Sequence, residues 1–106
     1  MAQYLLTVVE GTTAGLQFQL LSAGVPINLT GATVTLNLTG NDGVDVNNPA
    51  VAIIDTVNGK VTYTPLSGDL SSMKSPYAAR FKIIGSGGQT QFCPSGYRDE
   101  WNVVPL

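Results

Sequence analysis

Histidine is absent from the 106-residue sequence, and cysteine occurs once, as Cys93. Without histidine the chain cannot form a Ser-His or Cys-His nucleophile pair, a histidine metal site or the most common general base. A single cysteine excludes a disulfide within the chain. The sequence also lacks CxxC, GxGxxG and P-loop motifs. These absences predict a protein that is not an enzyme and that uses no cofactor.

Charged residues are scarce, at 11% of the sequence, where about 25% is typical. The net charge is −2, so repulsion between copies is weak. The five basic residues are too few and too scattered to follow a phosphate backbone, which argues against nucleic acid as a partner. No apolar run approaches the roughly 20 residues that cross a bilayer, and no signal-peptide pattern is present. We therefore expect an unprocessed protein made inside the cell, with no membrane partner.

Alternation of apolar and polar residues with a period of two is the dominant pattern of the sequence. Seven short segments carry apolar residues of this kind, separated by Gly, Asn and Pro: 4–9, 16–21, 33–39, 50–55, 60–64, 77–84 and 100–104. Segments 4–9 and 50–55 are more continuously apolar, as in strands covered on both faces or in strands paired late in folding. The pattern predicts an all-β protein, an antiparallel β-sandwich of about seven strands with negligible helix. The length suits one domain spanning residues 1–106.

Turn residues indicate how these strands are connected. Asn58-Gly59 predicts a type I′ hairpin, because that turn needs positive φ at both central residues. Pro26 lacks an amide donor and belongs at a strand end or edge, and Gly31 permits a bend or a close approach before segment 33–39. The stretch 67–74 predicts one short helical turn, capped by Ser67 or Asp69. The glycine-rich stretch 85–88 predicts a hairpin tip, because no helical pattern follows it.

Three features resemble chemical sites only in part. Asp42 and Asp45 could offer oxygen atoms to Ca²⁺, but their spacing matches no EF-hand and the bidentate Glu is missing, so we expect a solvated turn without metal. Asp99 and Glu100 are adjacent in a predicted strand, so their carboxylates point to opposite faces and do not form a glycosidase pair. Cys93 has no basic neighbourhood and is expected to be a small buried hydrophobe or a loop thiol.

Apolar and aromatic residues gather toward both ends of the sequence, in YLLTVV and EWNVVPL. A small sandwich has difficulty covering so much apolar strand by itself. We therefore predict an interface from these segments, made of Tyr4, Leu5, Leu6, Tyr97, Trp101, Val104 and Leu106. In an alternative interpretation, Tyr63, Tyr97 and Trp101 stack on sugars. Against this stacking, Trp and Phe on a sandwich strand are more often core residues.

Two stretches of the sequence resemble a known phage domain. They are FQLLSAGVPINLTGATVTLNL and GKVTYTPLSGDLSSMKSPYAARFKII. The pattern is that of the immunoglobulin-like N-terminal domain of upper baseplate proteins in tailed bacteriophages, and it extends over roughly residues 16 to 104. LTGATVTL is its most specific element. The matching residues are Gly24, Pro26, Leu29, Thr30, Gly31, Ala32, Val34, Gly59, Val61, Tyr63, Asp69, Leu70, Tyr77, Ala79 and Phe81.

This resemblance implies an immunoglobulin-like sandwich in a structural protein of the virion. It favours a docking or adaptor module of the tail or baseplate, with other phage structural proteins and copies of itself as partners. Capsid decoration, or a head-fibre protein, is the alternative within the virion, and a carbohydrate-binding module is an alternative of another class. In the family, further segments that build a host-binding arm normally follow this domain. Because the sequence ends at Leu106, we expect this module to work without such an arm.

Overall fold

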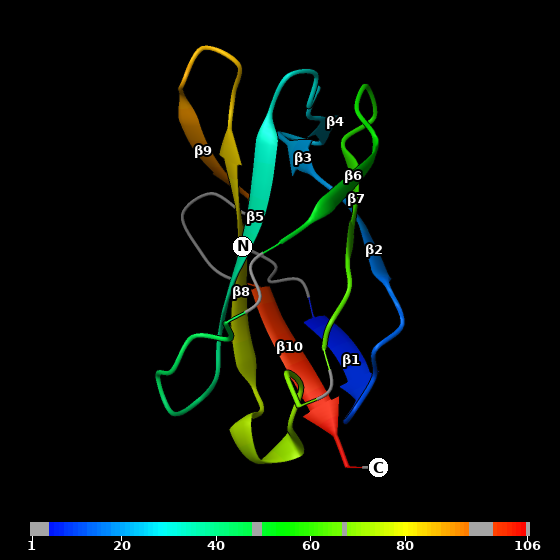
Figure 1. The fold of residues 1–106 in the computed structure, drawn as a ribbon, viewed down its shortest axis with the longest axis vertical. Coiled ribbons are helices and arrows are strands. Elements are labelled where there is room, and N and C mark those ends of the chain that lie inside the picture. Colours follow the sequence, from blue (N-terminus) through cyan, green and yellow to red (C-terminus); the bar gives the residue numbers. More distant parts are fainter. Residues whose placement is uncertain (1–4, 48–49, 67, 94–98, 106) are drawn as a thin grey trace.

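The computed structural model describes residues 5–47, 50–66, 68–93 and 99–105 (Figure 1). Regular structure within these residues consists of strands and one short 3₁₀ helix, η1 (Ser72–Lys74). In chain order the strands are β1 (Leu5–Val9), β2 (Leu16–Gln19), β3 (Leu21–Ser22), β4 (Val25–Pro26), β5 (Thr33–Thr39), β6 (Ala52–Asp55), β7 (Lys60–Tyr63), β8 (Tyr77–Ile84), β9 (Thr90–Cys93) and β10 (Asp99–Val104).

Two main sheets face each other, as Figure 1 shows. The larger sheet has the order β1-β10-β8-β5, and β9 also pairs with β8. Because β5 occupies one edge of β8, β9 and β10 share its other edge, beside residues 81–84 and 77–79 respectively. The smaller main sheet has the order β2-β7-β6, and β3 and β4 form a separate hairpin. The molecule extends 40 Å along its longest axis, which is vertical in Figure 1.

The core lies between the two main sheets and is built by the inward-facing residues of the alternating segments. An aromatic cluster joins the layers: Phe18 of β2 stacks on Trp101 of β10, with ring centroids 5.4 Å apart. Phe18 also contacts Phe81 of β8, and Tyr63 of β7 contacts Trp101. The buried hydrophobic residues are Val8, Leu20, Leu29, Val34, Leu36, Leu38, Val61, Tyr63, Leu70, Tyr77, Ala79, Phe81, Ile83, Trp101 and Val103.

All seven predicted segments form strands, namely β1, β2, β5, β6, β7, β8 and β10, which confirms the all-β sandwich. The sequence pattern missed β3, β4 and β9. The first two are very short, and β9 exposes most of its residues, so none of them carries a strong apolar alternation. The pairing of β1 with β10 is parallel, whereas a purely antiparallel sandwich was predicted.

The expectation that segments 4–9 and 50–55 are covered on both faces is wrong. Val8 is buried but its neighbour Val9 is exposed, and Ile54 is exposed beside the half-buried Ile53. Their strands, β1 and β6, lie at sheet edges, and the described residues form no third layer over their outer faces.

Asn58-Gly59 lies in the hairpin between β6 and β7, but not in a two-residue type I′ turn. Residues 56–59 connect the strands, and of these four only Gly59 has a positive φ, at +66°. A Cβ at Gly59 would lie 2.7 Å from the carbonyl oxygen of Ile27 and 2.8 Å from that of Leu20. Glycine is therefore required here by a close backbone approach from a distant part of the chain.

The short helical turn predicted in residues 67–74 is η1, but its cap differs from the prediction. The Oγ of Ser71 accepts a hydrogen bond from the N–H of Met73, at 3.3 Å. Asp69 instead accepts from the N–H of Leu66, at 2.8 Å, and Ser67 lies outside the described residues. Stretch 85–88 forms the predicted hairpin tip, between β8 and β9. In the described part of the chain, no helix is both long and apolar enough to cross a membrane.

Candidate docking surface

One end of the sandwich is built from three segments without a charged residue, with Asp55 and Lys60 at its border. It is formed by residues 21–32, 56–59 and 84–91, and we refer to it as the neutral end. Figure 1 shows these segments together at the top of the molecule, around the β3–β4, β6–β7 and β8–β9 connections. Several of its apolar side chains face solvent, including Leu21 and Ile84, and Val25 and Val57 are 64% and 63% exposed. An exposed apolar surface without charge is typical of the central part of a protein–protein interface.

A cleft of about 230 Å³ opens in the neutral end, between the loop before β5 and the β8–β9 hairpin. Its lining combines an aliphatic part with side-chain amides and hydroxyls. The lining residues are Ile27, Asn28, Thr30, Ala32, Ile83, Gly85, Ser86, Gln89 and Gln91.

The first wall of the cleft is built by the INLTGA stretch, part of which belongs to the most specific motif of the sequence. The Oδ1 of Asn28 accepts hydrogen bonds from the N–H and the Oγ1 of Thr30, at 3.0 and 2.7 Å. The buried Leu29 anchors the loop, and its N–H donates to the carbonyl oxygen of Thr56, at 2.7 Å. Gly31 has a φ of +72°, and a Cβ there would lie 3.0 Å from the Cβ of Ser86. Glycine at this position therefore lets the two loops meet.

The second wall is the β8–β9 hairpin. The N–H of Gly85 donates to the carbonyl oxygen of Gln89 at 2.8 Å, and the N–H of Gly88 donates to that of Gly85 at 2.9 Å. Within the described residues, the side-chain amides of Gln89 and Gln91 have no hydrogen-bond partner, and neither does the Nδ2 of Asn28. These groups can therefore bond to a molecule that enters the cleft.

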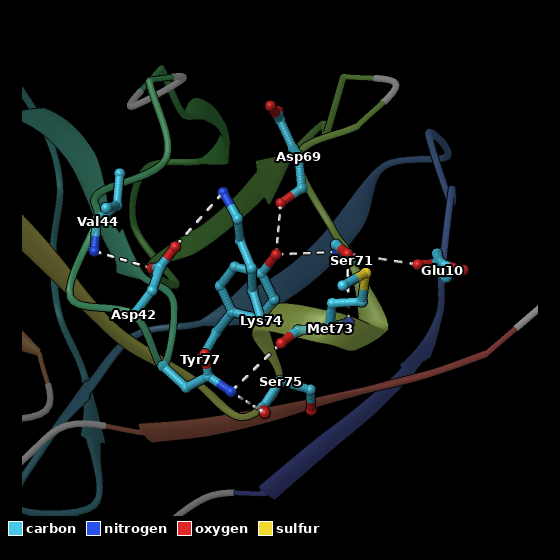
Figure 2. A network of polar contacts seen from close by, with 10 residues as sticks. Glu10, Asp42, Val44, Asp69, Ser71, Met73, Lys74, Ser75 and Tyr77 are labelled. Carbon is cyan, nitrogen blue, oxygen red and sulfur yellow. Dashed lines mark hydrogen bonds and ion pairs between the residues drawn. The ribbon is translucent and has the colours of Figure 1, made fainter.

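The opposite end of the sandwich is different in character, and we refer to it as the acidic end. It contains η1, the preceding loop and the loop after β5, with Glu10, Asp42 and Asp69 among its residues. The Oε1 of Glu10 accepts hydrogen bonds from the N–H and Oγ of Ser72, at 3.0 and 3.2 Å, and from the Oγ of Ser71. Tyr77 accepts from the N–H of Ser71 and donates to the carbonyl oxygen of Asp69 (Figure 2).

The loop after β5 is tied to η1 in the same network. The Nδ2 of Asn41 donates to the carbonyl oxygen of Ser75 at 2.7 Å, and Lys74 pairs with Asp42 at 3.8 Å. Asp42 also accepts from the N–H of Val44, and Asp45 accepts from the Oγ1 of Thr39. Asp42 and Asp45, which were considered above as Ca²⁺ ligands, thus both take part in local contacts. Among the described residues, no group of three His, Cys, Asp or Glu side chains could hold a metal ion.

The residues of the predicted terminal interface lie in different environments. Trp101 is 1% exposed and belongs to the core, as does Tyr63, so neither presents a face to a sugar or a partner. Leu6 is half-buried and packs against the core, whereas Val104 is 37% exposed. The backbone of Leu5 belongs to β1. Tyr4, Tyr97 and Leu106 lie outside the described residues.

Two further predicted features can be located. Cys93 on β9 is half-buried and packs against the core, with its Sγ 3.6 Å from the carbonyl oxygen of Leu21, and burial raises the pKa of its thiol. This agrees with the predicted small hydrophobe. Asp99 and Glu100 lie at the start of β10, opposite Ala79 and Ala78 of β8.

The sequence matches the family model of the BppU N-terminal domain over residues 2–92, which is most of the chain. This chain belongs to the BppU N-terminal domain family. BppU is the baseplate upper protein, and its N-terminal domain indicates a structural protein of a phage baseplate. The BppU-type domain described here is accordingly a component of the virion and interacts with other phage structural proteins. No curated protein matches the sequence.

Solved structures resemble this BppU-type domain in fold. CopC from Methylosinus trichosporium OB3b superposes with a TM-score of 0.61 at 13% sequence identity, covering 97% of this chain and 86% of that chain. A chain of the ZIG-8–RIG-5 IG1–IG1 heterodimer gives a TM-score of 0.48 at 14% identity, covering 97% of this chain and 83% of that chain. The likeness to CopC supports the immunoglobulin-like sandwich and shows the fold alone.

Proposed function

We propose that this BppU-type domain is a docking module of the baseplate, present in many identical copies, that attaches to neighbouring structural proteins through its neutral end. The observation that carries the proposal is the charge-free surface with exposed Leu21, Val25, Val57 and Ile84. Burial of apolar side chains drives association, and charged residues are depleted from interface centres.

The edge formed by β1 and β10 is a second proposed contact of the same module. Among the described strands β1 pairs only with β10, so its other edge is free to accept a strand from a partner. Val104, on the neighbouring strand, is partly exposed there. Leu5 and Leu6 of β1 and Val104 of β10, three of the predicted interface residues, belong to the strands of this proposed contact.

A non-enzymatic role fits these features. Family membership supports a structural component, and the sequence contains no histidine. The proposal treats residues 1–106 as one docking unit. Attachment to the capsid surface is the alternative location, and no observation on the molecule favours it over the baseplate.

The proposal is tested by mixing the purified protein with tail particles of the phage that encodes it, assembled without this chain, and pelleting them. Binding is expected at low salt and at 1 M salt, because contacts between charge-free surfaces are little affected by a Debye length of about 3 Å. Failure to bind at both salts, or binding at low salt alone, would overturn the proposed mode of docking.

A further inference from the structure

We infer that the cleft of the neutral end receives an uncharged loop from a neighbouring baseplate protein. In this arrangement the peptide groups of the loop bond to the carboxamides of Asn28, Gln89 and Gln91. A small apolar side chain of the loop packs on Ile27, Ala32 and Ile83. The inference rests on the proposed docking function and specifies the chemistry of the partner.

The charge of the occupant follows from the lining. No residue of the cleft is charged, and neither are the exposed residues around it on the neutral end. A charged group that entered would lose its hydration without gaining an opposite charge, which is costly. The complementary partner surface is therefore also uncharged. This argues against phosphate groups, cations and charged peptide segments as ligands.

The polar groups of the cleft favour peptide groups as partners. A carboxamide offers both donors and an acceptor, as the peptide group does. The amides of Gln89 and Gln91 have no partner among the described residues, and the Nδ2 of Asn28 is also unpartnered there. A loop with its own N–H and C=O groups can satisfy these amides without burying any polar group unpaired.

The size of the cleft favours a protein loop over a free small molecule. Its volume of about 230 Å³ is below the roughly 300–1,000 Å³ that is usual for small-molecule pockets. The surface around it continues with the exposed side chains of Leu21, Val25 and Ile84. A loop tip can fill the cleft while the rest of its protein covers these side chains, so the two features form one interface.

The cleft is also formed before a partner arrives. The hydrogen bonds of Asn28 to Thr30 fix one wall, and the Gly85–Gln89 hydrogen bond fixes the other. Gly31 lets the walls meet at Ser86. Because the backbone of both walls is already fixed, ordering the site costs mainly the rotamer freedom of the exposed Gln89 and Gln91 side chains.

The test uses two isosteric substitutions, Gln89→Glu and Gln91→Glu, combined in one variant. They add charge to the cleft with almost no change of volume, and both side chains lie on the surface. The control is Gln17→Glu, which makes one such change at an exposed position on β2, and each single cleft substitution is measured beside it. A neutral variant, Gln89→Ala, removes hydrogen bonding without adding charge. Thermal melting of each variant verifies that it folds.

Binding to tail particles lacking this chain is then measured for each variant at about 0.15 M and 1 M salt. The doubly charged variant is expected to bind at least about tenfold more weakly at both salts, because it buries uncompensated charge. Gln89→Ala should bind about three- to tenfold more weakly, and Gln17→Glu within about twofold of the wild type.

The outcomes separate the inference from the function on which it rests. If the wild type fails to bind particles, the docking function is overturned. If the wild type binds and the doubly charged variant binds within about twofold of it, the cleft inference is overturned while docking stands. Sedimentation of the protein alone adds a third outcome. Self-association that the doubly charged variant abolishes would make a second copy the occupant, and would also overturn the inference.

Discussion

The neutral end and the acidic end of this BppU-type domain both expose apolar side chains, but they use their polar groups differently. At the acidic end, Met73 and Leu66 are exposed beside Glu10 and Tyr77, whose polar atoms bond to the backbone of the same end. At the neutral end the amides of Gln89 and Gln91 have no partner within the described residues.

This difference separates two roles that polar residues have on a small sandwich. The network around Glu10 and Tyr77 satisfies backbone groups that η1 and its preceding loop leave unpaired, so it stabilises the fold. The amides of Gln89 and Gln91, in contrast, bond to no group within the described residues. Exposed apolar residues alone therefore do not identify the docking surface. The proposal of the neutral end as docking surface rests on their combination with the uncharged amides of Gln89 and Gln91.

The largest expected effect is on the core that supports both ends. Leu36→Ala on β5 should lower the free energy of unfolding by about 2–5 kcal/mol, because Leu36 is 3% exposed and its loss leaves a cavity. Thr35→Ala, at a half-buried position on the opposite face of the same strand, should cost less, about 1 kcal/mol or below. Chemical denaturation measures both. Equal losses would show that the two faces of β5 have been assigned incorrectly.

Tyr77→Phe tests the acidic end by itself. The substitution should cost about 1–3 kcal/mol of stability, because the N–H of Ser71 and the carbonyl oxygen of Asp69 lose their partner. Binding to particles should remain unchanged at saturating protein, since the neutral end is untouched. A variant that kept full stability would show that water replaces the hydroxyl without cost. A folded variant that lost binding would place the docking surface at the acidic end instead.

Gly31→Ala and Gly43→Ala compare the two ends at matched backbone conformations. Both glycines have positive φ, +72° and +80°, so alanine at either position should cost about 1–2 kcal/mol. A Cβ at Gly43 would contact nothing within 4 Å, whereas one at Gly31 would press on Ser86. Gly31→Ala should therefore be the more destabilising and should also weaken docking, as denaturation and particle binding can show. Equal effects on both measurements would argue against a preformed contact between the cleft walls.

The smallest expected effect concerns Asp55, which lies at the border of the neutral end. Hydrogen bonds from the side chain and then the backbone N–H of Asn58 lower the pKa of Asp55. A lowered folded-state pKa means that Asp55 contributes stability above its unfolded pKa, and that this contribution is lost as pH falls through the folded pKa. NMR titration should give a midpoint below the ordinary aspartate value, and Asn58→Ala should raise it. A midpoint at or above the ordinary value would contradict the hydrogen-bond geometry.

The strands could be predicted from the sequence because their information is local. Alternation at Val34, Leu36 and Leu38 gives β5 its register and its buried face directly. The cleft could not be predicted in this way, because its walls come from residues 27–32 and 83–91, which are brought together by the pairing of β5 with β8. One signal was available: both segments lack charge and both contain glycine and carboxamides.

The errors have the same origin. The Asn58-Gly59 pair predicted a type I′ turn. Glycine is instead required at position 59 because the backbone of Leu20 and Ile27, far away in the sequence, lies too close to leave room for a side chain. Trp101 was placed at an interface because it lies near the end of the chain, whereas Phe18 on the facing sheet covers it. Contacts between layers decide such positions, and a local pattern does not contain them.

The parallel pairing of β1 with β10 has a consequence for how the domain folds. It joins residues 5–9 to residues 100–104, so forming it closes a loop that contains nearly all of the described chain. The chain loses the entropy of closing that loop before the contacts between β1 and β10 stabilise the fold. Folds rich in such long-range contacts therefore form slowly, on the order of milliseconds to seconds. During synthesis the larger sheet cannot be completed until residue 104 has left the ribosome. Until then the outward edge of β8 that β10 will cover is open to other strands, so newly made copies are most prone to mispair with one another at this stage.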